Sequence, residues 1–218
     1  MAEKKIKPTL LIADDHRMFL EGLRGLLAPH YEIVGEAEDG EELIRQAQKL
    51  QPEVIVSDLS MPGLSGLKAL RELKRVGVGS KVVIVTMHEE PEFAAEAIQG
   101  GAAGYVLKNA ASSELLTAID EALSGGVYIT PRLAREAFEI AAGNGAGETG
   151  TAPELNERHR DILRLLAKGL VAKEIGARLN ISPRTVEYHK YKLIEKLGVK
   201  TTAELVQFAV QQGLTEGE

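Results

Sequence analysis

The sequence predicts an α/β fold with a doubly wound, five-stranded parallel sheet, followed by a small all-α domain of four helices. Over the first 127 residues, short apolar and β-branched runs alternate with segments of helical spacing. This alternation is typical of parallel strands that helices cover on both faces. After Pro153 the apolar spacing is helical throughout, so no further strand is expected there.

The expected strands are short, and most of them end in a polar residue or are followed directly by a charged one. They cover Thr9–Ala13, a run beginning at Ile33, Val54–Ser57, Lys81–Thr86 and Gly104–Leu107. The expected helices cover Met18–Leu27, Glu41–Leu50, Ser65–Val76, a segment beginning at Pro91, and Ser112–Leu123. Proline suits a first helical turn because the amide hydrogen that it lacks has no partner there. In such folds, ligands bind beyond the carboxyl ends of the strands.

Composition shifts divide the chain into three regions. Residues 7–127 form the α/β domain, residues 128–153 a helix and flexible linker, and residues 154–214 the helical domain. The stretch from Gly143 to Pro153 is rich in glycine and small polar residues, a composition typical of a flexible linker.

The last region contains a helix-turn-helix pattern. A short helix over Lys173–Asn180 precedes a turn at Ile181–Pro183, and a longer basic helix runs from Arg184 to about Leu197. Ser182 is placed to cap that helix, since a hydroxyl can accept from a free amide of the first turn. Thr201 and Glu204 form a capping box that opens a fourth helix. This arrangement is typical of DNA-binding domains.

Composition excludes several classes of protein. The 218 residues include no cysteine, so disulfides, zinc fingers and iron–sulfur sites are impossible. The first residues are charged and lack the apolar region of a signal peptide, and no run approaches the roughly 20 apolar residues of a membrane span. We therefore expect a cytoplasmic protein with no membrane partner.

The net charge of −6 conceals two regions of opposite sign. Residues 155–200 carry 11 Lys and Arg against 5 Asp and Glu, a net charge of +6, so the remainder carries −12. Such asymmetry suggests different partners for the two parts of a chain. The basic region could meet nucleic acid phosphates, while the acidic remainder could hold a cation.

Reactive side chains gather at the expected strand ends. Asp14 and Asp15 follow the first strand, Asp58 the third, Thr86 closes the fourth and Lys108 follows the fifth. Three carboxylates at one crevice repel each other unless a cation relieves them, and Mg²⁺ suits oxygen ligands beside a phosphate. An aspartate there can attack phosphorus, while the lysine and the threonine hydroxyl stabilise the phosphoryl oxygens.

Several motifs carry a family resemblance. The runs L-L-I-A-D-D-H, V-S-D-L-S-M-P-G-L-S-G, V-T-M-H and G-Y-V-L-K make residues 9–124 similar to the receiver domain of two-component response regulators, a flavodoxin-like fold. The runs L-L-A-K-G-L, K-E-I-G-A-R-L and S-P-R-T-V-E-Y-H make residues 155–212 similar to a LuxR-type helix-turn-helix. Together they resemble the NarL/FixJ subfamily.

The resemblance implies a transcriptional regulator of a two-component phosphorelay. Asp58 would accept a phosphoryl group from a sensor histidine kinase. Asp15, Asp58 and the backbone carbonyl of Ser60 would ligate Mg²⁺, and Asp14 would act through a bound water. The protein would then form a homodimer on double-stranded DNA, whose half-sites lie about one helical turn apart.

Within that interpretation, Asp58, Lys108 and Thr86 are the residues of the phosphoryl-transfer chemistry, and Thr86 and Tyr105 are the implied switch pair. The protein assists its own phosphorylation but is otherwise not an enzyme. A phosphatase would typically carry an acid–base carboxylate two residues after its nucleophile, where this chain has Ser60. A binding module that never takes phosphate would lack Asp58 or Lys108. His88 is expected at the rim of the site, where it could influence how water reaches the phosphoryl group.

The long basic helix has two distinct sides. At about 100° per residue, Val186, Leu193 and Leu197 face the domain core. The outward residues expected to reach base edges are Glu187, Tyr188 and Tyr191. Those expected to contact phosphates are Lys173, Thr185, His189 and Lys192. Arg184 completes the expected DNA-facing surface.

Overall fold

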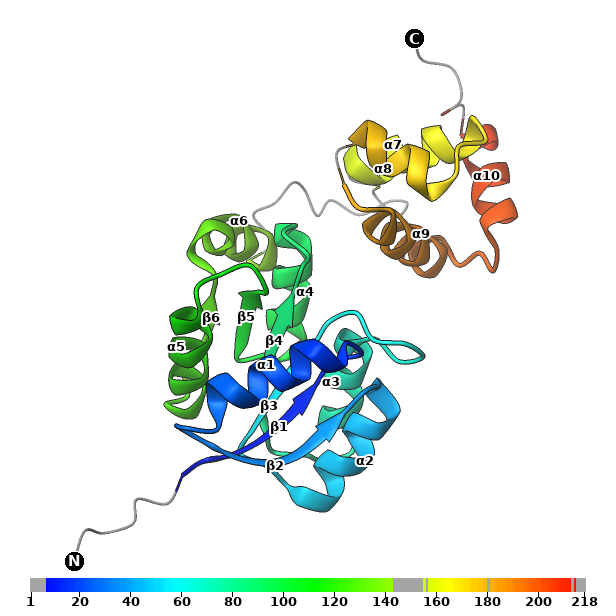
Figure 1. Ribbon diagram of the computed structural model, residues 1–218. Coiled ribbons are helices and arrows are strands. Elements are labelled where there is room, and N and C mark those ends of the chain that lie inside the picture. Colours follow the sequence, from blue (N-terminus) through cyan, green and yellow to red (C-terminus); the bar gives the residue numbers. More distant parts are fainter. Residues whose placement is uncertain (1–6, 143–154, 156, 180, 213, 215–218) are drawn as a thin grey trace, which may run out of the picture. The chain divides into compact units, whose positions relative to one another are not determined.

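A computed structural model describes residues 7–142, 155, 157–179, 181–212 and 214. It divides the chain into two compact units, Met1–Gly147 and Glu148–Glu218, which Figure 1 shows in sequence colours. The expected linker Gly143–Pro153 and residues Asn156 and Asn180 lie outside the described part. Within that part, no helix is both long and apolar enough to cross a membrane.

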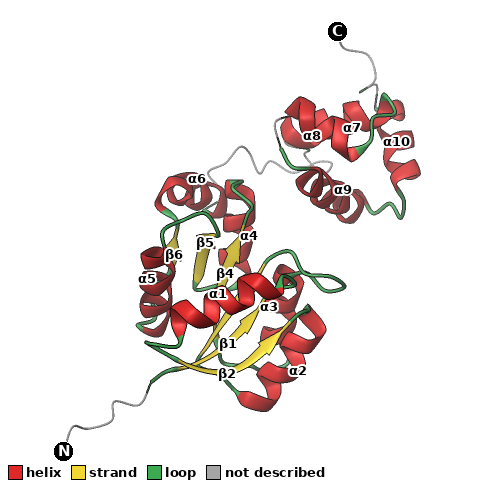
Figure 2. Cartoon of the chain, in the orientation of Figure 1, coloured by secondary structure: helices red, strands yellow, loops and turns green. Residues whose placement is uncertain are grey.

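The first unit is a parallel sheet with the strand order β2-β1-β3-β4-β5-β6, drawn in yellow in Figure 2. The strands are β1 Thr9–Ala13, β2 Glu32–Ala37, β3 Val54–Asp58, β4 Lys81–Thr86, β5 Gly104–Leu107 and β6 Tyr128–Ile129. β3 and β5 are buried along their whole length. This explains their nearly continuous apolar sequences, because helices cover both faces of the sheet.

The sheet has six strands, so the prediction of five is corrected. β6 is parallel to β5 and pairs Ile129 with Tyr105. Two residues are too few to show a periodic pattern, which is why the sequence did not reveal this strand. Thr130 extends the contact, because its amide donates to the carbonyl of Tyr105 and its hydroxyl accepts from the amide of Leu107.

Helices follow all six strands. They are α1 Arg17–Leu27, α2 Gly40–Leu50, α3 Gly66–Arg75, α4 Pro91–Gly100, α5 Ser112–Leu123 and α6 Pro131–Ala141. Leu20 and Leu27 of α1 share a buried cluster with Ile119 of α5 and with Leu10 and Val56 of the sheet. α1 and α5 therefore cover one face, while α2, α3 and α4 contact one another in series and cover the other (Figure 1).

α6 extends the first unit beyond its sheet. It packs against α4, and its residues Leu133 and Ala137 are buried. The amide of Gln99 on α4 donates to the carbonyl oxygen of Ala141 at 3.3 Å. Residues 128–142, which were expected to begin the connection to the second domain, thus pack as part of the first unit.

The second unit has the four predicted helices: α7 Glu157–Ala167, α8 Ala172–Leu179, α9 Pro183–Leu197 and α10 Thr202–Gln211 (Figure 2). Its core joins Ile162, Ile175, Val186 and Leu193, which are all fully buried. The hydroxyl of Ser182 accepts from the amide of Thr185 at 3.0 Å, which confirms the cap that the sequence predicted at the start of α9.

Candidate functional site

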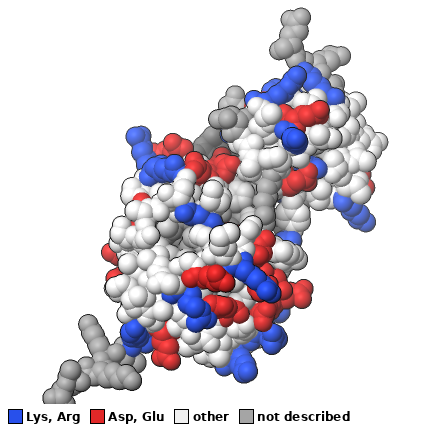
Figure 3. All heavy atoms as spheres, viewed as in Figure 1, with Lys and Arg blue, Asp and Glu red and all other residues white. Residues whose placement is uncertain are grey.

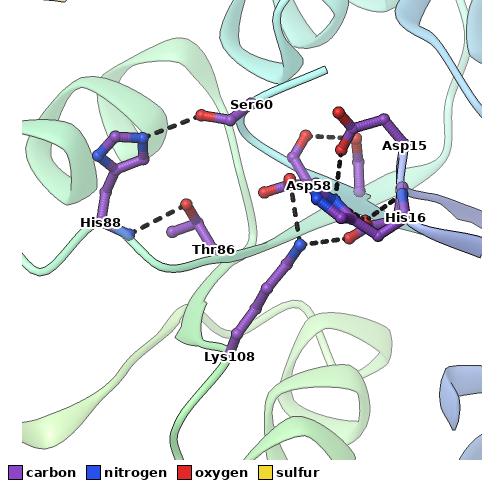
Figure 4. A network of polar contacts seen from close by, with 9 residues as sticks. Asp15, His16, Asp58, Ser60, Thr86, His88 and Lys108 are labelled. Carbon is purple, nitrogen blue, oxygen red and sulfur yellow. Dashed lines mark hydrogen bonds and ion pairs between the residues drawn. The ribbon is translucent and has the colours of Figure 1, made fainter. Parts of the chain in front are cut away.

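The residues predicted at the strand ends come together at one edge of the sheet. β1, β3, β4 and β5 are neighbours, so their carboxyl ends meet. Figure 4 shows Lys108 reaching towards Asp58, with Thr86 and His88 on one side and Asp15 on the other. Parallel pairing alone brings these residues together, although they are far apart in the sequence.

Lys108 connects two of the carboxylates. Its Nζ lies 2.5 Å from Oδ2 of Asp14 and 3.1 Å from Oδ2 of Asp58. The side chains of Lys108, Asp14 and Asp58 are 10%, 1% and 5% exposed, so water screens the charges weakly. The ammonium is therefore held beside both carboxylates at the carboxyl edge of the sheet.

The surroundings of Asp58 destabilise the charged form of its carboxyl group. Burial raises its pKa above the usual value, and the charge of Asp14 raises it further. Lys108 and a hydrogen bond from the Ser60 backbone lower the pKa, but burial is the larger effect. A carboxylate destabilised in this way gains from any process that brings a compensating cation.

The site has the charge and ligand chemistry of a divalent cation site. Asp14, Asp15 and Asp58 bring three negative charges against the one positive charge of Lys108. Carboxylate oxygens are hard ligands of the kind that Mg²⁺ prefers. The donor set thus fits Mg²⁺, whose charge would balance the remaining two.

His16 is a feature of this edge that sequence reasoning missed. Its Nδ1 lies 2.8 Å from Oδ1 of Asp15 and 3.3 Å from Oδ1 of Asp14. Its backbone amide also donates to Oδ1 of Asp14 at 2.9 Å. The A-D-D-H run offered a signal, because an imidazole one residue after two carboxylates is within reach of both.

The expected switch pair is linked through the backbone of His88. Thr86 and Tyr105 are both fully buried. The amide of His88 donates to Oγ1 of Thr86 at 3.2 Å, and the hydroxyl of Tyr105 donates to the carbonyl oxygen of His88 at 3.0 Å. Burial raises the pKa of Tyr105 well above its usual value, so the hydroxyl stays protonated and can donate.

The ring of His88 contacts Ser60, Phe93 and Glu90. Its Nε2 lies 2.9 Å from Oγ of Ser60, a contact visible in Figure 4. The ring packs at 4.4 Å on Phe93, and Nδ1 lies 3.6 Å from a carboxylate oxygen of Glu90. The sequence predicted His88 at the rim of the site, but it gave no sign of the contact with Ser60.

Most of the residues expected to contact DNA lie on the surface of α8 and α9. Lys173 is exposed, the Tyr191 residue is 44% exposed, and the Glu187 side chain is 57% exposed and pairs with Lys190 at 2.9 Å. The ammonium of Lys192 lies 5.7 Å from the ring centre of Tyr188. These residues offer positive charge, an acceptor and aromatic faces on the surfaces of the two helices.

Two residues of that expected surface are corrected. Thr185 and His189 are only 1% and 3% exposed, so their side chains belong to the domain interior instead of contacting phosphates. His189 follows Val186 by three residues and precedes Leu193 by four, which puts it on the core side of the helix. The side chain of Arg184 lies outside the described residues.

The surface of the first unit carries charges of both signs. Acidic and basic side chains are interspersed on its visible face in Figure 3. Surface ion pairs such as Arg24–Glu36 at 2.6 Å and Arg17–Glu38 at 2.9 Å occur there. Exposed pairs of this kind stabilise a protein little.

Comparison with known proteins identifies both units. Residues 10–120 match the family described as response regulator receiver domain, and residues 153–209 match bacterial regulatory proteins of the luxR family. The response regulator UvrY of Escherichia coli (strain K12) is 34% identical over 213 residues, which cover 96% of each chain. The response regulator GacA of Pseudomonas aeruginosa is 34% identical over 211 residues, covering 95% of this chain and 97% of GacA.

Solved structures that resemble this chain are also of response regulators. RcsB from Salmonella enterica serovar Typhimurium, bound to promoter P1flhDC with the phosphomimetic BeF3⁻, is 30% identical. The match covers 93% of this chain and 98% of RcsB, with a TM-score of 0.56. A LuxR-family response regulator from Aurantimonas sp. SI85-9A1 is 34% identical over 62% of this chain and 99% of its own, with a TM-score of 0.59. This chain therefore belongs to the NarL/FixJ-type two-component response regulators, DNA-binding transcription regulators that join a receiver domain to a luxR-family helix-turn-helix.

Proposed function

We propose that a sensor histidine kinase phosphorylates Asp58 and that this phosphorylation controls DNA binding by the helix-turn-helix unit. One observation carries the proposal: the ammonium of Lys108 pairs with both Asp14 and Asp58 at the carboxyl edge of the sheet. An acidic site that merely bound a cation would not need a buried lysine between its carboxylates.

The transfer follows from the positions of these groups. A carboxylate oxygen of Asp58 attacks phosphorus, the bond between phosphorus and the kinase histidine breaks, and the electron pair of that bond returns to the imidazole. Lys108 and the hydroxyl of Thr86 then stabilise the charge on the phosphoryl oxygens. Because Thr86 accepts from His88 through a lone pair, its hydroxyl hydrogen remains able to donate.

The residues that would hold Mg²⁺ are Asp15, Asp58 and the backbone carbonyl of Ser60, with Asp14 acting through a water molecule. When bound, the cation supplies charge neutralisation for an anionic phosphoryl group approaching an anionic carboxylate. The protein's own contribution is to keep these carboxylates close together and partly shielded from water.

On the DNA side, we propose that Glu187, Tyr188 and Tyr191 reach base edges. Lys173 and Lys192 would contact phosphates and set the register of the helix in the groove. We also propose that the phosphorylated protein binds DNA as a homodimer. A structure of two RcsB dimers bound to two parallel DNAs supports this proposal by similarity.

The experiment that tests the proposal is phosphorylation by a small acyl phosphate in the presence of Mg²⁺, followed by intact mass. We expect one added phosphoryl group, none in Asp58→Asn, and none after removal of Mg²⁺. Sequencing of genomic DNA bound by the same samples should show stronger enrichment for the phosphorylated wild type. Normal labelling of Asp58→Asn would overturn the proposal. Identical DNA enrichment for the phosphorylated and unphosphorylated protein would overturn it as well.

A further inference from the structure

The ammonium of Lys108 has a third neighbour besides its two carboxylates. Nζ lies over the ring of Phe19 on α1, 4.4 Å from the ring centre. The aromatic face, Asp14 and Asp58 therefore surround one nearly buried cation. Phe19 stands four residues after Asp15, on the first turn of the helix that follows the acidic pair.

The ring acts on the ammonium differently from the carboxylates. An aromatic face attracts a cation through its quadrupole, and the attraction grows when water is excluded. The ring accepts no conventional hydrogen bond, so the three N–H groups of the ammonium remain available for oxygen ligands. These ligands are now carboxylate oxygens and would be phosphoryl oxygens after transfer.

The surroundings of Phe19 make this contact important for the lysine. Phe19 and Lys108 both line an open cavity of about 220 Å³ between α1 and the start of α5, together with Leu23 and Leu115. With a smaller side chain at position 19, water entering this cavity would reach the ammonium. A hydrated ammonium is free to turn away from Asp58.

We propose that Phe19 is a positioning residue for phosphoryl transfer, whose ring holds the ammonium of Lys108 beside Asp58 through a cation–π contact. This inference rests on the proposed function, since it concerns the lysine that stabilises the phosphoryl oxygens. It adds a residue outside the polar strand ends to the machinery of that site.

The test separates the effect of the ring's quadrupole from the effect of its shape. We would replace Phe19 by 3,4,5-trifluorophenylalanine, which keeps the size of the ring but weakens its quadrupole, and compare Phe19→Tyr and Phe19→Leu. The readout is the rate constant for phosphorylation by a small acyl phosphate with Mg²⁺, followed by intact mass. We expect about five-fold slower labelling for the fluorinated and leucine variants and a nearly unchanged rate for tyrosine.

Phe138 provides the matched control, because it is 50% exposed on α6 and is far in sequence from the site. The same fluorinated residue at position 138 should leave the rate unchanged. In a Lys108→Met background, fluorination of Phe19 should have no further effect, since no cation remains for the ring to hold. Thermal unfolding of each variant checks that the fold is intact.

Wild-type labelling of the fluorinated variant would overturn the inference, even if Phe19→Leu were slow, because the ring would then act through packing alone. An undiminished effect of fluorination in the Lys108→Met background would overturn it as well. Failure of the proposed function is a separate outcome: the wild type would then not be labelled, or Asp58→Asn would be.

Discussion

The hydroxyl of Ser60 lies 2.9 Å from Nε2 of His88, so a hydrogen bond joins the loop after β3 to the loop after β4. Asp58 lies two residues before Ser60, and Thr86 two residues before His88. The same histidine is 7% exposed and packs on the buried ring of Phe93. The bridge therefore places a nearly buried ring on the Thr86 side of the site that we propose accepts the phosphoryl group (Figure 4).

We predict that this bridge protects the phosphoryl group from water. His88→Ala should shorten the lifetime of the phosphorylated protein by about five-fold, the equivalent of one hydrogen bond. Intact mass after removal of the phosphodonor measures this lifetime. Ser60→Ala should have the same effect, and the double variant should be no worse than either single variant. His30→Ala is the control, because His30 is exposed in the same unit. A longer lifetime in His88→Ala would mean that the imidazole promotes hydrolysis.

The raised pKa of Asp58 predicts a gain in stability when its charge is removed. Because the folded state holds this proton more tightly than the unfolded chain, stability falls as pH rises from below the ordinary aspartate value through the raised pKa. Asp58→Asn should thus unfold at a higher temperature than the wild type at pH 7 in a chelator. The difference should shrink at pH 3 and on addition of Mg²⁺. A less stable variant at pH 7 would show that Lys108 outweighs burial.

Gly66 is predicted to be essential for the backbone geometry of Asp58. A Cβ added there would collide with the carbonyl oxygen of Asp58 and lie 2.9 Å from Cα of Leu59. Gly66→Ala should therefore shift the backbone of Asp58, destabilise the protein by about 1–3 kcal/mol and slow phosphorylation. Urea unfolding and intact mass measure the two effects.

Gly22 on α1 provides the control for this substitution. Among the described residues, no atom within 4 Å opposes a Cβ at that position. Alanine suits a helix interior better than glycine, so Gly22→Ala should stabilise the protein by about 0.5–1 kcal/mol. Equal effects of the two substitutions would contradict the close approach at Asp58.

His159 is predicted to titrate far below the ordinary histidine range. Burial, and then the nearby His189, Lys196 and Lys192, lower its pKa to about 4, and its ring lies 5.5 Å from that of His189. The unfolded chain then binds this proton first, so stability should fall as pH drops from 6.5 towards 4, by at most about 1.4 kcal/mol per pH unit. NMR titration of the His159 ring, assigned with His159→Gln, measures the pKa. A midpoint near 6.5 would contradict the partial burial of this side chain.

The proposed DNA contacts predict two kinds of loss. Tyr188→Ala or Glu187→Ala should cost about 1–3 kcal/mol of binding free energy and relax preference at one base pair. Lys192→Ala should weaken all DNA sequences alike and reduce the salt dependence by one phosphate contact. Thr185→Val, which keeps the shape of a buried side chain, should leave the salt dependence unchanged. Fluorescence anisotropy on enriched genomic sites at several salt concentrations distinguishes these outcomes.

The amino-acid sequence was sufficient to predict the α/β fold, the helical second domain and the meeting of Asp14, Asp58, Thr86 and Lys108. The parallel sheet explains why this was predictable. Its strands place their carboxyl ends at the same edge, regardless of the conformation of the loops between them. The four helices of the second unit were equally predictable, since their apolar spacing is strong and their caps are local.

Only the tertiary structure decided the rest. The two-residue strand β6 carries too few residues to show a period. The bridge from Ser60 to His88 and the contact of Phe19 with Lys108 each join segments whose relative positions are set by packing. Periodicity reports which side of a helix or strand is apolar. It contains no information on which distant side chain a given ring will touch, because that depends on how the elements pack in three dimensions.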